Sequence, residues 1–147
     1  MGGRVLGVDY GERRIGLAVS DALGITAQPV GVVTVSSPRE AIVAVERAVE
    51  KHEATHVVVG LPKSLSGHMG PKALETIRFV AAYQRSSHVP VSLWDERLTT
   101  ASAERVMIEA DVKRRKRRRA VDMVAAQLIL QSYLDVHRHA SRGDTFA

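Results

Sequence analysis

Short apolar runs separated by turn residues open the chain and predict β-strands. The first two are separated by only a few turn residues, so we expect them to form a hairpin. The third follows a short polar connection and continues the antiparallel arrangement. The last run contains Pro90 near its start, which favours a position at the edge of a sheet. The five runs cover residues 5–9, 15–20, 30–35, 55–60 and 89–95.

After the third run the apolar positions change to helical spacing. Ser37, Pro38 and Glu40 form a capping box with proline at the first helical position, and this predicts the start of a helix. Pro71 opens a second predicted helix. Its inner face is expected to consist of Ala73, Ile77, Val80 and Ala81.

Two more helices are expected in the C-terminal part of the chain. Thr99 or Thr100 caps the first of them. The second ends near Val136, and it carries Asp122 at the edge of the stripe that should pack on the sheet. The other members of this stripe are Ala125, Ala126, Ile129 and Tyr133.

These elements predict an α/β fold built on one mixed sheet. The first three strands are antiparallel, and crossovers through helices make the fourth and fifth strands parallel to the first. With the first strand central, the expected order is 3-2-1-4-5, flanked by helices. We expect a single domain over residues 1–136 and a polar, disordered tail over residues 137–147.

Composition supports this picture and excludes several classes of protein. The chain has 147 residues, of which 45% are hydrophobic, enough for one domain with a proper core. No apolar run approaches the ~20 residues that span a bilayer, and no secretory pattern is present, so we expect a cytoplasmic protein without membrane contact. The absence of cysteine excludes disulfides and thiolate metal sites. Aromatic residues, at 4%, are too few for a stacking platform to be the main nucleic-acid-binding device.

The positive charge of the chain is concentrated in one segment. Seven of the 21 Lys and Arg residues are consecutive, and the remaining 14 face 16 Asp and Glu residues. This distribution indicates a local contact with a polyanion, although a solvated helix entrance explains it equally well. The segment, called the basic run below, consists of Lys113, Arg114, Arg115, Lys116, Arg117, Arg118 and Arg119.

Acidic residues stand at the carboxyl ends of the first and last predicted strands. Asp9 ends the first, and Asp95 and Glu96 end the last; in an open α/β sheet these ends face one crevice, where ligands bind. Asp122 adds a third carboxylate from the last helix. Such a site, without cysteine or convincing histidine ligands, suits Mg²⁺ or Mn²⁺, and these ions support phosphodiester hydrolysis.

Simpler explanations remain open for each of these acids. An acid after an apolar strand also begins ordinary solvated turns. The negative charge of Asp122 on a packed face costs free energy unless a positive charge is close to it. Arg118 or Arg119, one turn earlier, can supply that charge without any metal.

The loop after the fourth predicted strand is rich in glycine and suits a contact with phosphate. Gly60, Gly67 and Gly70 permit close backbone approach, Lys63 adds a cation, and a helix N-terminus follows at Pro71. Walker A spacing is missing, so an ordinary connection is the alternative. The six histidines show no catalytic pattern, and surface positions are expected for them.

Four longer segments stand out as motifs: VDYGERRIGLAVSD, VVVGLPKSLSGHMGPKA, WDERLTTASAERVM and KRRRAVDMVAAQLILQSYL. In this order, and over nearly the full length, they resemble the motifs of the YqgF/RuvX family. The family's D-x-G-x-x-R-x-G start matches residues 9–16, its GLP matches 60–62, its DER-L-T-T matches 95–100, and its VD-x-x-A-A matches 121–126.

The resemblance implies a ribonuclease H-like fold and a metal-dependent nuclease related to Holliday junction resolvases. It also implies a role in maturation of the 5′ end of pre-16S ribosomal RNA, to which family members are assigned. By the motif match, Asp9, Glu96 and Asp122 are the expected catalytic and metal-binding acids. Asp95 is the alternative to Glu96, because neighbours on a strand point to opposite faces.

The expected partner is structured RNA or branched DNA. Arg14, Lys63, Arg97 and the basic run are the candidates for its phosphates. Resolution of Holliday junctions is the alternative activity, and a catalytically silent nucleic-acid-binding module is the alternative class. An actin-like ATPase shares the first hairpin but needs a second domain that this chain is too short to contain. The sequence leaves monomer and homodimer equally open.

Overall fold

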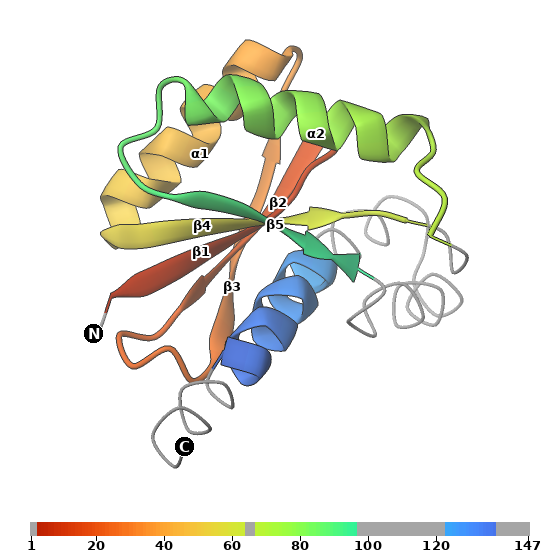
Figure 1. Ribbon diagram of the computed structural model, residues 1–147. Helices are drawn as coiled ribbons and strands as arrows, with labels where there is room; N and C mark the ends of the chain where they lie inside the picture. The colour runs from red at the N-terminus through yellow and green to blue at the C-terminus, as the bar shows by residue number, and fades with distance from the viewer. Residues whose placement is uncertain (1–2, 64–66, 97–122, 138–147) are drawn as a thin grey trace, which may run out of the picture.

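One five-stranded sheet forms the centre of the protein, and the computed structural model describes residues 3–63, 67–96 and 123–137 (Figure 1). The strands are β1 (Arg4–Asp9), β2 (Arg14–Ser20), β3 (Ala27–Thr34), β4 (Ala54–Leu61) and β5 (Val91–Asp95). Their order is β3-β2-β1-β4-β5; β1 and β3 run antiparallel to β2, and β1 and β5 run parallel to β4. The predicted order, the strand directions and the edge position of the strand after Pro90 are all confirmed.

Helices cover both faces of this sheet (Figure 1). α1 (Pro38–His52) and α2 (Pro71–Gln84) lie on one face, which we call the α1/α2 face. A helix over residues 123–137, called the C-terminal helix below, crosses the other face. No helix within the described ranges is long and apolar enough to cross a membrane. The helix expected after Thr99 or Thr100 lies outside the described residues.

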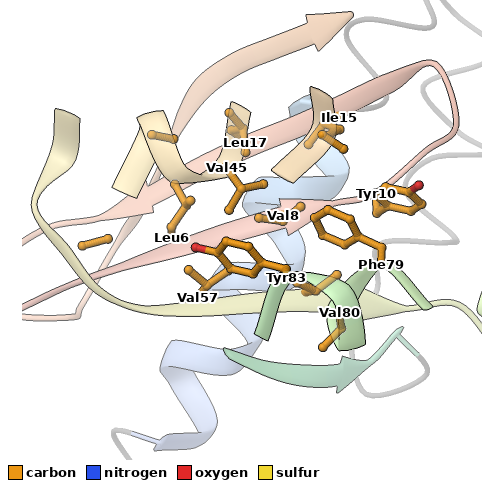
Figure 2. Packing of buried hydrophobic residues seen from close by; sticks show 14 of the residues in the cluster. Leu6, Val8, Tyr10, Ile15, Leu17, Val45, Val57, Phe79, Val80 and Tyr83 are labelled. Atoms are coloured by element: carbon orange, nitrogen blue, oxygen red, sulfur yellow. The ribbon is translucent and has the colours of Figure 1, made fainter. Parts of the chain in front are cut away.

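The larger core fills the space between the sheet and the α1/α2 layer (Figure 2). Alternate residues of β1, β2 and β4 point into it, as the two-residue period of a strand requires. The rings of Tyr10 and Phe79 stack in this core with centroids 4.3 Å apart. Its labelled members are Leu6, Val8, Tyr10, Ile15, Leu17, Val45, Val57, Phe79, Val80 and Tyr83.

The start of α1 agrees with the sequence except in one detail. Ser37 is the N-cap, and its hydroxyl accepts a hydrogen bond from the Glu40 N–H at 3.2 Å. In a capping box the Glu40 carboxylate would accept from the N-cap N–H. Instead it accepts from the backbone N–H of Ser36 at 3.1 Å and from the Ser36 hydroxyl, one residue earlier.

The structure corrects the predicted boundaries of β3 and the predicted inner face of α2. β3 begins at Ala27, three residues before the apolar run, because antiparallel pairing with β2 continues through the polar residues there. On α2, Ala73 and Val80 are buried as expected, but Ile77 is only partly buried and Ala81 is exposed. The helix is turned so that larger rings enter the core instead; the buried residues missed by the prediction are Thr76, Phe79 and Tyr83.

Candidate active site

The alternation of side chains along β1 directs Asp9 toward the C-terminal helix. Leu6 and Val8 belong to the core under α1 and α2, so Gly7 and Asp9 face the other way. A Cβ at Gly7 would lie 2.7 Å from the Cβ of Leu130 in the C-terminal helix. Asp9 is only 5% exposed, so its carboxylate is held in a restricted environment at the end of the central strand.

Glu96 reaches this same face of the sheet from the end of β5. Trp94 donates a hydrogen bond from Nε1 to the Ser132 hydroxyl at 3.1 Å, which places its ring against the C-terminal helix. Glu96 follows two residues later, and its Oε2 lies 3.2 Å from the position of a Cβ at Gly60. It is also 5% exposed.

Asp95 belongs to the opposite side of β5. Its Oδ2 lies 3.7 Å from Nζ of Lys63, and the two side chains are about a fifth exposed. Val91, four residues earlier on β5, points to the same side as Asp95 and packs on the α1/α2 core. The geometry therefore puts Glu96, and not Asp95, on the face that carries Asp9.

β4 lies between β1 and β5, the two strands whose ends carry these acids, and Gly60 is the β4 residue that lies beside their carboxyl ends. Val8 of β1 pairs with Val59, and Gly60 pairs with Trp94 of β5. A Cβ at Gly60 would approach Cδ1 of Ile129 to 2.4 Å as well as Glu96. The glycine thus lets the C-terminal helix lie close to the sheet and keeps space beside the Glu96 carboxylate.

The described acids suit a divalent metal in type but do not complete its ligand set. Asp9 and Glu96 are buried carboxylates on one face, which is the donor chemistry that Mg²⁺ and Mn²⁺ prefer. No group of three His, Asp or Glu side chains close enough to hold a metal occurs among residues 3–63, 67–96 and 123–137. The third expected ligand, Asp122, lies outside the described residues, as do Arg97 and the basic run.

Two of the residues predicted to contact phosphate, Arg14 and Lys63, lie within the described part of the chain. Lys63 lies beside Asp95, so its charge is partly matched by this neighbouring acid. Arg14 begins β2, two residues before Gly16, the partner of Asp9 in the β1–β2 ladder. α2 begins at Pro71 as expected, with Gly70 as its N-cap and no side-chain cap.

The role of Gly60 differs from the expected one, because its close neighbour is a helix of the chain itself. The same holds for Gly7, for which no role was predicted: its missing Cβ makes room for Leu130 and for the carbonyl oxygen of Ala126. The small residues at both positions are the sequence signal for the close approach of this helix. Gly67 does occupy a left-handed conformation, with a φ of 88°.

His56 is only partly exposed, so the expected surface position holds for it in part. Its Nε2 lies 2.7 Å from the Ser92 hydroxyl, and its ring is stacked 5.7 Å from Tyr133. Burial, with a smaller contribution from His137, lowers the pKa of His56 below its usual value. His56 shares a face of β4 with the buried Val58, two residues later, and this spacing is the sequence signal for its partial burial.

Comparison with known proteins agrees with the fold and the motifs. A family model described as "RuvX: Holliday junction resolvase" matches residues 3–136. A protein of Halothermothrix orenii named "Putative pre-16S rRNA nuclease" is 48% identical over 132 residues, covering 90% of this chain and 94% of the relative. A protein of the same name in Myxococcus xanthus is 47% identical over 135 residues, covering 92% and 89%.

Solved structures of resolvases share the fold at low sequence identity. RuvC of Thermus thermophilus in complex with a Holliday junction substrate superposes with a TM-score of 0.57 at 14% identity, covering 91% of this chain and 96% of RuvC. The fowlpox virus Holliday junction resolvase gives 0.52 at 15% identity, covering 90% and 99%. These similarities confirm the ribonuclease H-like fold. Together with the family match over nearly the whole length, they confirm the prediction from the four motifs: the chain belongs to the RuvX family.

Proposed function

We propose that this protein is a metal-dependent nuclease whose cellular substrate is the precursor of 16S ribosomal RNA. The observation that carries the proposal is the placement of Asp9 and Glu96. Two acids from strands at different places in the chain are buried on one face, with the glycine of the intervening strand between them. Buried carboxylates need cations, hydrogen-bond donors or a metal ion around them, and two carboxylates on one face supply the oxygen ligands that Mg²⁺ and Mn²⁺ prefer.

In this proposal Asp9, Glu96 and Asp122 hold Mg²⁺ or Mn²⁺. The bound ion would activate water and stabilise the leaving oxygen of a phosphodiester. Asp9 and Glu96 contribute fixed positions, because each comes from the end of a strand in the sheet. The packing of the C-terminal helix against Gly7 and Gly60 holds this helix close to the face of the sheet that carries both acids.

The substrate assignment rests on the relatives. Both relatives cited above carry the name of a pre-16S rRNA nuclease and match this chain over nine-tenths of its length. Holliday junction DNA is the second candidate, and the description of the matching family favours it. Cytoplasmic location, a single domain over residues 1–136, and phosphate binding by Arg14, Lys63, Arg97 and the basic run belong to the same proposal.

The test is a cleavage assay with purified protein and Mn²⁺, offering precursor ribosomal RNA beside a four-way DNA junction. We expect cleavage of the RNA that stops in excess chelator. Asp9→Asn and Glu96→Gln should each abolish cleavage while nucleic-acid affinity persists, since they remove metal ligands and no phosphate contact.

Asp95→Asn is the matched control, because Asp95 neighbours Glu96 but lies on the opposite face beside Lys63. It should retain most of the activity. Cleavage that survives the chelator would contradict the proposed chemistry. Paired nicks in the junction by a stable dimer, with no cut in the RNA, would instead assign the second candidate, since symmetric resolution needs two active sites related by a two-fold axis.

A further inference from the structure

Beyond the candidate site, the α1/α2 face of the protein carries a continuous groove. Two adjoining hollows of about 660 and 620 Å³ share the lining residues Tyr10, Glu12, Arg13 and Glu75. Both volumes lie within the range of small-molecule sites, roughly 300–1,000 Å³. We call the two hollows together the α2 groove, because residues of α2 line each of them.

The α2 groove adjoins the end of β1, the strand that carries Asp9 of the candidate active site. Tyr10 lines both hollows and directly follows Asp9 in the chain. Because Asp9 and Tyr10 point to opposite faces, the groove and the acids lie on the two sides of the same strand end. The turn at Gly11 and Glu12 separates them, and Gly11 itself lines the smaller hollow.

The two ends of the groove differ in chemistry. The smaller hollow adds the cations Arg14 and Lys72 to the shared residues, so three cations face two acids at this end. The larger hollow is lined by Val35, Phe79 and Ala82 and is predominantly apolar.

The shared acids and Arg13 also line the larger hollow, which adds one further cation, Arg78. Glu75 and Glu12 lie close enough to Tyr10 to add to the effect of burial in raising the pKa of its hydroxyl. Arg78 is exposed at the rim. An occupant therefore meets Arg14 and Lys72 at one end of the groove, apolar walls and the Arg78 guanidinium at the other, and the shared carboxylates and Arg13 between them.

A nucleotide offers groups that match this lining: an anionic phosphate, and a planar base whose edge carries hydrogen-bond donors and whose faces stack on apolar side chains or a guanidinium. We propose that the α2 groove holds one nucleotide of the substrate strand flanking the cleaved bond, with its base in the larger hollow and its phosphate toward Arg14 and Lys72. The inference rests on the proposed function for the identity of the strand. It assigns specificity to a surface separate from the metal-binding acids.

The experiment scans the substrate with abasic sugars, one position at a time, and measures kcat/KM for cleavage. We expect one position near the cut at which loss of the base lowers kcat/KM about tenfold. Ala82→Trp fills the larger hollow and should remove this dependence, so that normal and abasic substrates behave alike. Ala81→Trp is the matched control, because Ala81 is its exposed neighbour on α2 and lines neither hollow; it should keep the wild-type pattern.

The same scan is run as binding of labelled oligonucleotides to Asp9→Asn protein by fluorescence anisotropy, so that it does not depend on catalysis. A binding pattern that Ala82→Trp erases, in the absence of any cleavage by the wild type, would support the groove while overturning the proposed function. Metal-dependent cleavage with no base-sensitive position, or with the same pattern in both tryptophan variants, would overturn the groove and leave the nuclease standing.

A second pair of variants covers the case in which Ala82→Trp fails to fold. Arg78→Ala removes the guanidinium at the rim and should reduce the effect of the abasic position by at least half. Arg85→Ala changes an exposed arginine at the end of α2 that lines neither hollow, and it should have no effect. Equal behaviour of these two variants would also contradict the proposal.

Discussion

Replacing Gly60 with alanine should destabilise the protein, because the added methyl group has no room. Its carbon would lie 2.4 Å from Cδ1 and 3.1 Å from Cγ1 of Ile129. Carbon atoms in contact prefer about 3.5–4.0 Å, so the Ile129 side chain or the C-terminal helix has to move by roughly 1 Å. Ile129 is fully buried, which leaves the side chain little freedom to yield.

The expected magnitude follows from two opposing effects. Overpacking of a buried site costs about 1–3 kcal/mol. Alanine also stiffens the unfolded chain, which returns about 0.4–1 kcal/mol because Gly60 is not among the glycines with positive φ. The net loss should be about 1–2 kcal/mol, or a decrease in Tm of about 2–4 °C for each kcal/mol.

A double-mutant cycle measured by urea denaturation identifies the cause. Ile129→Val removes the clashing Cδ1 and costs about 0.5–1.5 kcal/mol alone. If the clash is the cause, the double variant should be more stable than the sum of the single effects predicts, by about 1 kcal/mol. Gly70→Ala is the control, since a Cβ at Gly70 meets no atom within 4 Å.

Additive effects in the cycle, within about 0.3 kcal/mol, would refute this explanation. The same would follow if Gly60→Ala were as stable as the wild type. A separate readout concerns Glu96, whose Oε2 would lie 3.2 Å from the new methyl group. Cleavage should therefore fall in Gly60→Ala and stay low in the double variant, although its stability is partly restored.

Three further outcomes are expected. Asp122→Asn should abolish cleavage and leave nucleic-acid affinity within about twofold in a filter-binding assay; undiminished cleavage would remove Asp122 from the site. Replacing three arginines of the basic run with serine should flatten the slope of log K against log salt by up to about 3, since each neutralised phosphate of duplex DNA contributes about 0.9, and an unchanged slope would show a merely solvated segment. Folding lowers the pKa of His56. Between about pH 6.5 and this lowered pKa the unfolded chain therefore binds more protons than the folded protein does. The free energy of unfolding should fall as the pH decreases through this window. His56→Gln should reduce this loss in urea titrations at pH 7, 6 and 5, and equal losses in both proteins would contradict the assignment.

Local patterns in the sequence determine most of the fold. Apolar runs of strand length and the capping residues before α1 give element types and starting points, because these depend on neighbours in the chain. The crossover rules then restrict the sheet to few topologies, and the observed order is the expected one. The four motifs also identify the family, since their order and spacing cover nearly the whole chain.

The candidate site depends on contacts that no local pattern contains. Asp95 and Glu96 are adjacent in sequence, and only the packing of Trp94 on Ser132 decides which face each acid takes. The rotation of α2 that buries Phe79 is a similar case, because several stripes of that helix are apolar and the sheet selects one.

The sequence by itself determined which residues can perform the chemistry, because carboxylates, glycines and cations have their properties wherever they stand. The tertiary structure alone decided which of them share a face, and it gave Gly7 and Gly60 their role in admitting the C-terminal helix. The physical reason is that side-chain direction in a sheet reverses at every residue, so a register fixed by distant packing determines whether an acid faces the site or the opposite layer.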